Sequence, residues 1–155
     1  MITAVDSNIL LDILTPGSRH GDESEKRLSD GVSAGSTVIC ETSYAELASH
    51  FADGLGLDRF ASQTGLTVQA TVPGTLYRAG IAWRDYSRRR TGTLVCPQCG
   101  AAQKIQCSQC KRPIATRQHI LADFIIGAHA LLQADQLLTR DRGCYRTYFP
   151  ELKLA

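Results

Sequence analysis

Several features are absent from this chain of 155 residues, and each absence excludes a class of protein. No apolar run reaches the ~18 residues that a membrane span requires. The first residues lack a basic stretch followed by an apolar run and a small-residue cleavage site, so we expect a soluble, cytoplasmic protein. No internal repeat or low-complexity tract is visible, which excludes a repeat architecture. The length has room for one domain with a filled core, residues 1–155.

The charges are divided unevenly along the chain. The formal net charge is +2, but residues 84–117 hold eight basic side chains and the single acid Asp85, so this segment carries +7 and the remainder −5. An acidic body with a basic segment suits a protein that holds metal ions in one place and phosphates in another. A solvated run of charges is the alternative. The basic residues are Arg84, Arg88, Arg89, Arg90, Lys104, Lys111, Arg112 and Arg117.

Short apolar runs alternate with stretches of helical periodicity. We predict strands at 2–5, 36–40, 66–70, 136–139 and 152–154, and helices at 7–14, 42–51, 57–63, 73–90 and 119–134. Ser7 is available to cap the first helix, and Leu121, Ile125, Ala128 and Leu132 form the expected core stripe of the last. This alternation predicts an α/β sandwich with a mainly parallel central sheet, in which ligands bind beyond the carboxyl ends of the strands.

Acidic residues follow the strands at the expected ligand-binding edge. Asp6 ends the first strand, and Asp141 comes shortly after the strand at 136–139. Both would therefore emerge at the same edge of a parallel sheet. Each has an ordinary alternative, because an aspartate after a strand is also a common helix cap.

Two further acids lie on predicted helices. Asp123 interrupts an apolar helix, where it shares a face with Gly127 and other small residues, although backbone donors alone could also satisfy it. Glu46 lies in the first turns of the helix after the second strand, and Glu41 competes with it for the same role.

Four carboxylates at one place repel one another unless a cation lies between them. Hard oxygen ligands select Mg²⁺ or Mn²⁺, which can polarise a phosphodiester and lower the pKa of an attacking water. The acids therefore indicate metal-dependent phosphodiester hydrolysis.

Four of the six cysteines form two Cys-x-x-Cys pairs inside residues 93–115, a segment without helical period. The pairs are Cys96 with Cys99 and Cys107 with Cys110, and their spacing lets four thiolates surround one structural Zn²⁺. Redox-active thiols or a chance cluster are the alternatives. Neighbouring Lys104, Lys111 and Arg112 could offset the charge of the four thiolates. We interpret Cys40 as a buried small hydrophobe and Cys144 as a bystander thiol.

Three motifs, VDSNILLDIL, ETSYAELASHF and ILADFIIGAHALLQADQLLTRDRGCYRTYFPEL, resemble in order those of PIN-domain proteins, in particular the VapC-type toxins of toxin–antitoxin systems. The resemblance spans nearly the whole chain outside the cysteine segment. It implies a PIN-like three-layer sandwich and an endoribonuclease held in check by an antitoxin. It makes Asp6, Glu46, Asp123 and Asp141 the metal-site acids, preferring Glu46 to Glu41.

The resemblance also implies that Asn8 and Thr139 support the acids by hydrogen bonds. Arg140 and Arg142 flank the fourth acid and could bind RNA phosphate, or serve as ordinary surface residues. Residues 93–115, which we interpret as an inserted zinc-ribbon subdomain, depart from the family pattern. With its basic residues it could grip RNA backbone, contact an antitoxin, or contact a second copy of the chain.

Two other functions remain open at this point. One is a ribosomal-RNA maturation nuclease, because PIN domains also occur with zinc ribbons in that role. The other is a non-catalytic zinc-ribbon RNA-binding protein on a PIN scaffold. The presence of all four acids favours an enzyme.

Overall fold

A computed structural model describes residues 1–89, 93–96, 99–114 and 119–155. Its elements, in chain order, are β1 (Ile2–Val5), α1 (Ser7–Leu14), α2 (Gly21–Ala34), β2 (Ser36–Cys40), α3 (Glu41–Ala48), α4 (Gly54–Gln63), β3 (Leu66–Gln69), α5 (Pro73–Arg89), β4 (Thr93–Val95), β5 (Ala102–Lys104), α6 (Leu121–Gln133), β6 (Gln136–Leu138) and α7 (Arg142–Tyr148).

The central sheet has four strands in the order β3-β2-β1-β6, and every neighbouring pair is parallel. The predicted α/β architecture is therefore confirmed. β1 and β6 come from opposite ends of the chain, yet they pair side by side, with Thr3 opposite Gln136 and Val5 opposite Leu138. Because the strands are parallel, the residues that follow β1 and β6 lie at the same edge of the sheet.

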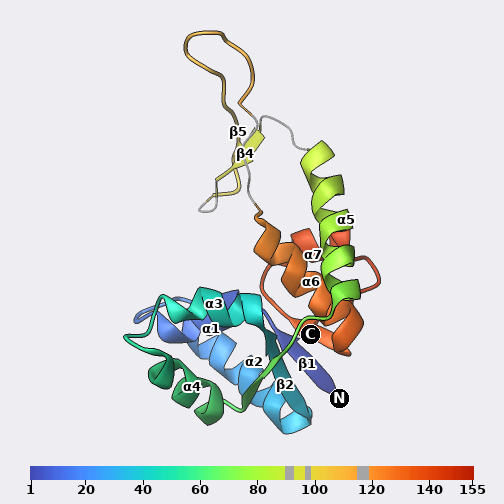
Figure 1. Ribbon diagram of the computed structural model, residues 1–155. Coiled ribbons are helices and arrows are strands. Elements are labelled where there is room, and N and C mark those ends of the chain that lie inside the picture. Colours follow the sequence, from blue (N-terminus) through green and yellow to red (C-terminus); the bar gives the residue numbers. More distant parts are fainter. Residues whose placement is uncertain (90–92, 97–98, 115–118) are drawn as a thin grey trace.

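Successive residues of each strand enter two different hydrophobic cores, because strand side chains alternate between faces. Ala4, Val38 and Leu137 pack with α5, α6 and α7, whereas their neighbours Val5, Ile39 and Leu138 pack with α1 to α4. The sheet is thus the middle layer of a three-layer sandwich. Figure 1 shows α1 to α4 gathered apart from α5 to α7. No helix among the described residues is long and apolar enough to cross a membrane.

Some local predictions were wrong. Asp6, rather than Ser7, caps α1, since its side chain accepts from the backbone N–H of Asn8. Helix α2 was not predicted, because Leu28 is the single apolar side chain that it buries. The predicted strand at 152–154 is reduced to a bridge between Leu137 and Leu154.

The predicted core stripe of α6 was half right, since Ala128 is buried and Ile125 packs against the core. Leu121 and Leu132 are exposed, whereas Phe124, Gly127 and Ala130 are buried. The helix is apolar nearly all round, so periodicity alone could not choose its buried face. Contact with α5 decides it.

The cysteine segment forms an arm that projects from the sandwich beside the ends of α5 and α6 (Figure 1). β4 and β5 pair antiparallel in the arm. Of the predicted insertion at 93–115, residues 97, 98 and 115 lie outside the described residues.

Gly127 brings α6 close to α7. A Cβ there would lie 2.5 Å from Phe149 Cε2 and 2.9 Å from Tyr145 Cε1, whereas a Cβ at Gly80 of α5 would meet nothing within 4 Å. We expect Gly127→Ala to lower the free energy of unfolding by about 1–3 kcal/mol through overpacking. Gly80→Ala, the matched control, should raise it by about 0.5–1 kcal/mol. Urea denaturation measures both, and equal effects would contradict this packing.

Candidate functional site

Asp6 lies at the centre of the candidate site, directly after β1. It is buried and accepts hydrogen bonds at Oδ2 from Asn8 Nδ2 at 2.7 Å, Thr139 Oγ1 at 2.7 Å and Tyr145 OH at 3.0 Å. Burial raises the pKa of Asp6 to about 6 although Thr139, the backbone N–H of Asn8 and Tyr145 lower it, and the charge of Asp123 adds to the increase. Sequence reasoning missed Tyr145, because nothing in its spacing indicates that α7 turns back towards β1.

Glu46 reaches the same site from α3 through Ser7. The Ser7 hydroxyl donates to Glu46 Oε2 at 2.5 Å and lies 3.4 Å from Asp6 Oδ1, so it stands between the two carboxylates. Burial raises the pKa of Glu46, and the charge of Asp123 raises it further, against the lowering effect of Ser7.

Glu41 lies elsewhere. Its carboxylate accepts from the backbone N–H of Thr71 at 2.8 Å and from the Thr71 hydroxyl, and these contacts lower its pKa. The structure therefore separates the two glutamates that the sequence spacing left open, and Glu46 is the one beside Asp6.

Asp123 lies in the first turn of α6, where its Oδ2 accepts from the backbone N–H of Ile120 at 2.8 Å. A backbone N–H therefore does satisfy Asp123, as the alternative to a metal site predicted. The Asp123 side chain is also near enough for its charge to raise the pKa values of Asp6 and Glu46. Asp123 therefore caps α6 and also lies close to Asp6 and Glu46.

Asp141 lies beyond β6 and caps α7, since its Oδ1 accepts from the backbone N–H of Cys144 at 3.2 Å. Its own backbone N–H donates to Thr139 Oγ1 at 3.0 Å, and Thr139 in turn donates to Asp6. Thr139 thus connects the end of β6 to the end of β1.

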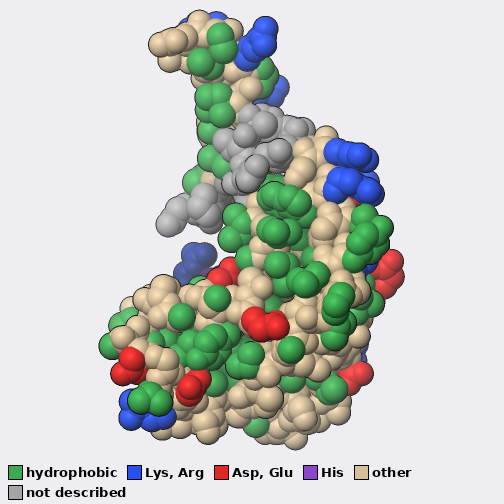
Figure 2. Space-filling view, in the orientation of Figure 1, with side chains coloured by type: hydrophobic (Ala, Val, Ile, Leu, Met, Phe, Trp, Pro, Cys, Tyr) green, Lys and Arg blue, Asp and Glu red, His purple; other side chains and the backbone are tan. Residues whose placement is uncertain are grey.

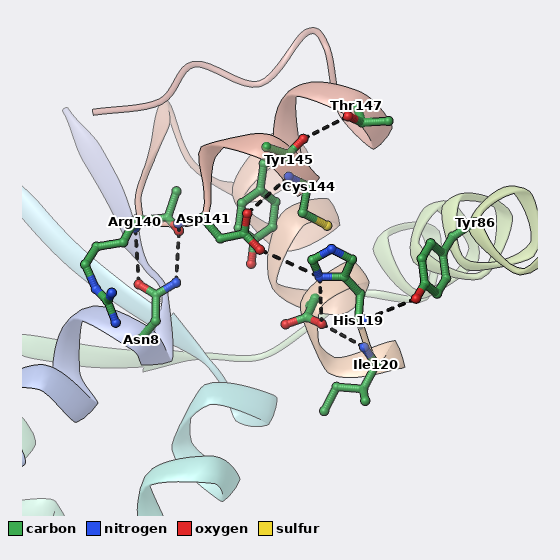
Figure 3. Close-up of polar contacts among 12 residues, drawn as sticks. Asn8, Tyr86, His119, Ile120, Arg140, Asp141, Cys144, Tyr145 and Thr147 are labelled. Carbon is green, nitrogen blue, oxygen red and sulfur yellow. Dashed lines mark hydrogen bonds and ion pairs between the residues drawn. The ribbon is translucent and has the colours of Figure 1, made fainter. Parts of the chain in front are cut away.

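The His119 imidazole is directed towards Asp141, as Figure 3 shows, and lies near Asp123 as well. Its Nδ1 is 3.7 Å from Asp123 Oδ2 and 3.6 Å from Asp141 Oδ2. Interaction with Asp123 raises the pKa of His119, as does the charge of Asp141, against partial burial. Sequence reasoning missed this residue, although its place four residues before Asp123 is a spacing that brings side chains together on a helix.

The cluster of Asp6, Glu46, Asp123 and Asp141 has the chemistry of a site for a hard cation. Its four carboxylates come from four separate segments, and among the described residues no three of them offer oxygen atoms that all lie within 4.8 Å of one another. A shared ion would therefore have to draw them together. Burial raises the pKa values of Asp6 and Glu46, the charge of Asp123 adds to the increase, and a cation beside them would oppose that effect. Oxygen donors of this kind fit Mg²⁺ or Mn²⁺.

Arg140 and Arg142, which flank Asp141, each contact another residue of the chain. Arg140 Nε lies 2.5 Å from Asp12 Oδ2, and Arg142 Nη2 donates to the Ala155 carbonyl at 2.6 Å. Either side chain would have to leave its partner to bind an RNA phosphate.

Other predicted RNA-binding residues are exposed. Figure 2 shows Lys and Arg side chains at the outer end of the arm and near the end of α5. The exposed members are Arg88, Arg89, Lys104, Lys111 and Arg112, whereas Arg90 and Arg117 lie outside the described residues.

Both Cys-x-x-Cys pairs form the same turn. The N–H of Gly100 donates to the Cys96 carbonyl at 2.9 Å, and the N–H of Lys111 donates to the Cys107 carbonyl at 2.9 Å. Gly100 and Lys111 also share a positive φ, 72° and 60°. Backbone and side-chain donors of residues 109 and 110 lower the pKa of Cys107, which favours a thiolate.

The two turns precede and follow β5. Among the described residues, no three of the four sulfur atoms lie within 4.8 Å of one another. One zinc ion would therefore have to draw the two turns together.

The raised pKa of Asp6 predicts a pH dependence of stability in metal-free protein. A carboxyl whose pKa is higher in the folded state favours folding while protonated, so this contribution is lost as pH rises from about 4 through about 6. We expect it to amount to about 3 kcal/mol, measured by urea denaturation in a chelator across this range. Asp6→Asn should lack this component. An Asp6 carboxyl that titrates near pH 4 by NMR would contradict the prediction.

Comparisons with known proteins support the fold. No protein-family model and no curated protein matches the chain. A solved structure of VapBC2 from Rickettsia felis, bound to a DNA fragment from their promoter, aligns with a TM-score of 0.61 and 17% identity over 100% of this chain and 98% of that chain. At this identity the likeness concerns the fold. The chain therefore has the PIN-like architecture that its motifs predicted, shared with the VapBC2 structure over its whole length.

Proposed function

We propose that this protein is a divalent-metal-dependent endoribonuclease, and that it acts as the toxin of a toxin–antitoxin pair. The observation that supports this proposal most is the link from Asp6 through the Ser7 hydroxyl to Glu46, with Asp123 near enough for its charge to raise the pKa of both carboxyls. The PIN-like fold agrees with it.

In this proposal, Asp6, Glu46, Asp123 and Asp141 hold Mg²⁺ or Mn²⁺. Such an ion, when bound, polarises a phosphodiester and lowers the pKa of an attacking water. The chain's contribution is to orient the ligands before the ion arrives.

Polar neighbours restrict the carboxylates of this site. Asn8, Thr139 and Tyr145 donate to Asp6 Oδ2, which leaves Oδ1 as the oxygen with fewer protein donors. Ser7 similarly restricts Glu46 Oε2. Ligands fixed in this way lose little freedom when they bind a cation.

The exposed basic residues of the arm and of the end of α5 are the proposed RNA contacts. Lys104, Lys111 and Arg112 belong to the arm, and Arg88 and Arg89 to α5. The arm has few aromatic side chains for stacking on bases, so we propose contacts to phosphate rather than to bases.

An antitoxin is the proposed partner, and the arm is one surface that it could contact. The likeness of the fold to the solved VapBC2 structure supports a partner of this kind. A ribosomal-RNA maturation nuclease would use the same acids on another RNA. A non-catalytic RNA-binding protein would have the same basic surface but no cleavage.

The first test is RNA cleavage by purified protein with Mg²⁺ or Mn²⁺. Asp6→Asn and Asp123→Asn should each reduce the cleavage rate by more than about 100-fold, since removing a metal ligand costs more than removing a group that supports one. RNA binding, measured by gel shift, should remain.

Glu41→Gln is the matched control, because Glu41 lies in a neighbouring helix turn but contacts Thr71 instead. Cleavage that is unchanged in both aspartate variants would end the metal-site assignment. Binding without any cleavage by the unaltered protein would favour the non-catalytic alternative.

The second proposal is a structural zinc ion held by Cys96, Cys99, Cys107 and Cys110. The shared turn geometry and the lowered pKa of Cys107 support it. Binding would supply the free energy that brings the two turns together.

Elemental analysis tests this assignment. The double variant Cys96→Ser, Cys99→Ser should lose one equivalent of zinc per chain and gain protease sensitivity in the arm. Cys40→Ser is the control, because Cys40 is buried beside Ser43 in the sandwich. A double variant that retains its full zinc content would contradict the prediction.

A further inference from the structure

A group of mixed metal-ligand side chains lies beside the acidic cluster. His119, Asp141 and Cys144 each offer one ligand atom, and these three atoms all lie within 4.8 Å of one another. In the part of the chain that the structure describes, this is the one group of three or more such side chains at that spacing. We propose that it is a second metal site, separate from the cysteine arm and adjoining the four acids, with which it shares Asp141.

The separations within this group fit ligands of a shared ion. Tetrahedral zinc with bonds of about 2.0–2.3 Å places neighbouring ligand atoms roughly 3.3–3.6 Å apart. His119 Nδ1 lies 3.6 Å from Asp141 Oδ2, which is too long for a hydrogen bond but close to that spacing. Asp123 Oδ2 lies 3.7 Å from the same nitrogen but does not lie within 4.8 Å of all three ligand atoms, so water would complete the coordination.

Two rigid helix starts position the three side chains. Asp141 and Cys144 belong to the cap and first turn of α7, where the Cys144 N–H donates to Asp141. His119 immediately precedes α6, and its backbone N–H donates to Tyr86 OH at 3.2 Å. Figure 3 shows the imidazole directed towards Asp141 and the Cys144 sulfur lying close to the ring.

The donor set selects the metal. Mg²⁺ takes oxygen ligands and holds its waters, whereas a nitrogen, a carboxylate oxygen and a buried sulfur suit Zn²⁺ or Co²⁺. The site therefore takes a borderline transition metal. Because it shares Asp141 with the carboxylate cluster, an ion bound here alters the ligands left for Mg²⁺. The site itself depends on geometry alone and does not rest on the proposed ribonuclease activity.

Cobalt binding provides the test, because a thiolate bound to Co²⁺ gives a charge-transfer absorption band. The background is the full chain with all four arm cysteines changed to serine, which leaves Cys40 and Cys144 as the thiols. We expect this protein to bind one Co²⁺ with a thiolate band that persists in excess Mg²⁺. Adding Cys144→Ser should abolish the band, and adding His119→Ala should weaken Co²⁺ affinity by more than about 100-fold.

Cys40→Ser in the same background is the matched control, since Cys40 is also buried but contacts Ser43. It should leave the band unchanged. A second measurement covers the case in which the serine background fails to fold: the otherwise unaltered chain should bind one more Co²⁺ equivalent than its Cys144→Ser variant. The proposal is overturned if the folded background shows no thiolate band, if the band survives Cys144→Ser, or if the two equivalents are equal.

Discussion

Carboxylates that lie near one another oppose each other's ionisation, and the candidate site depends on how the chain offsets this repulsion. Three of the four acids solve this problem in the same way, because each lies at the start of a helix and accepts from a backbone N–H there. Asp6 does so at α1, Asp123 at α6 and Asp141 at α7. The unpaired N–H groups of a first turn and the helix dipole both favour negative charge. Their stabilisation is incomplete at Asp6, whose pKa remains raised.

Helix starts can converge in this way only if strands from distant parts of the chain are neighbours. β1 pairs in parallel with β6, the last strand of the sheet, so the residues after them emerge together. Thr139 and Tyr145 then connect the two segments directly to Asp6. The parallel sheet thus places the acids, and short polar contacts orient them.

The arm leaves the sandwich intact because it is inserted between α5 and α6, two helices that pack on each other. α5 and α6 share one hydrophobic core, which includes Ala79, Tyr86 and Phe124. Their packing holds the sandwich together on both sides of the insertion. The exposed basic side chains of the arm, Lys104, Lys111 and Arg112, therefore belong to a different part of the chain from the four acids.

The sequence by itself determined the α/β class, the parallel sheet and the positions of the acids. These features depend on local patterns, since a short apolar run followed by an acid describes both a buried strand and its end. It could not select the buried face of α6, because that helix is apolar nearly all round and its neighbours decide which side is covered. It also gave no sign of α2, whose burial rests on Leu28.

Only the tertiary structure decided which polar side chains meet. Glu46 joins Asp6 while Glu41 contacts Thr71, although both lie on α3. Cys144, interpreted as a bystander, lies buried beside His119 and Asp141. Such contacts join residues that are far apart in the chain, and their existence depends on strand order and helix direction. The spacing of residues within one segment determines neither the order of the strands nor the direction of the helices.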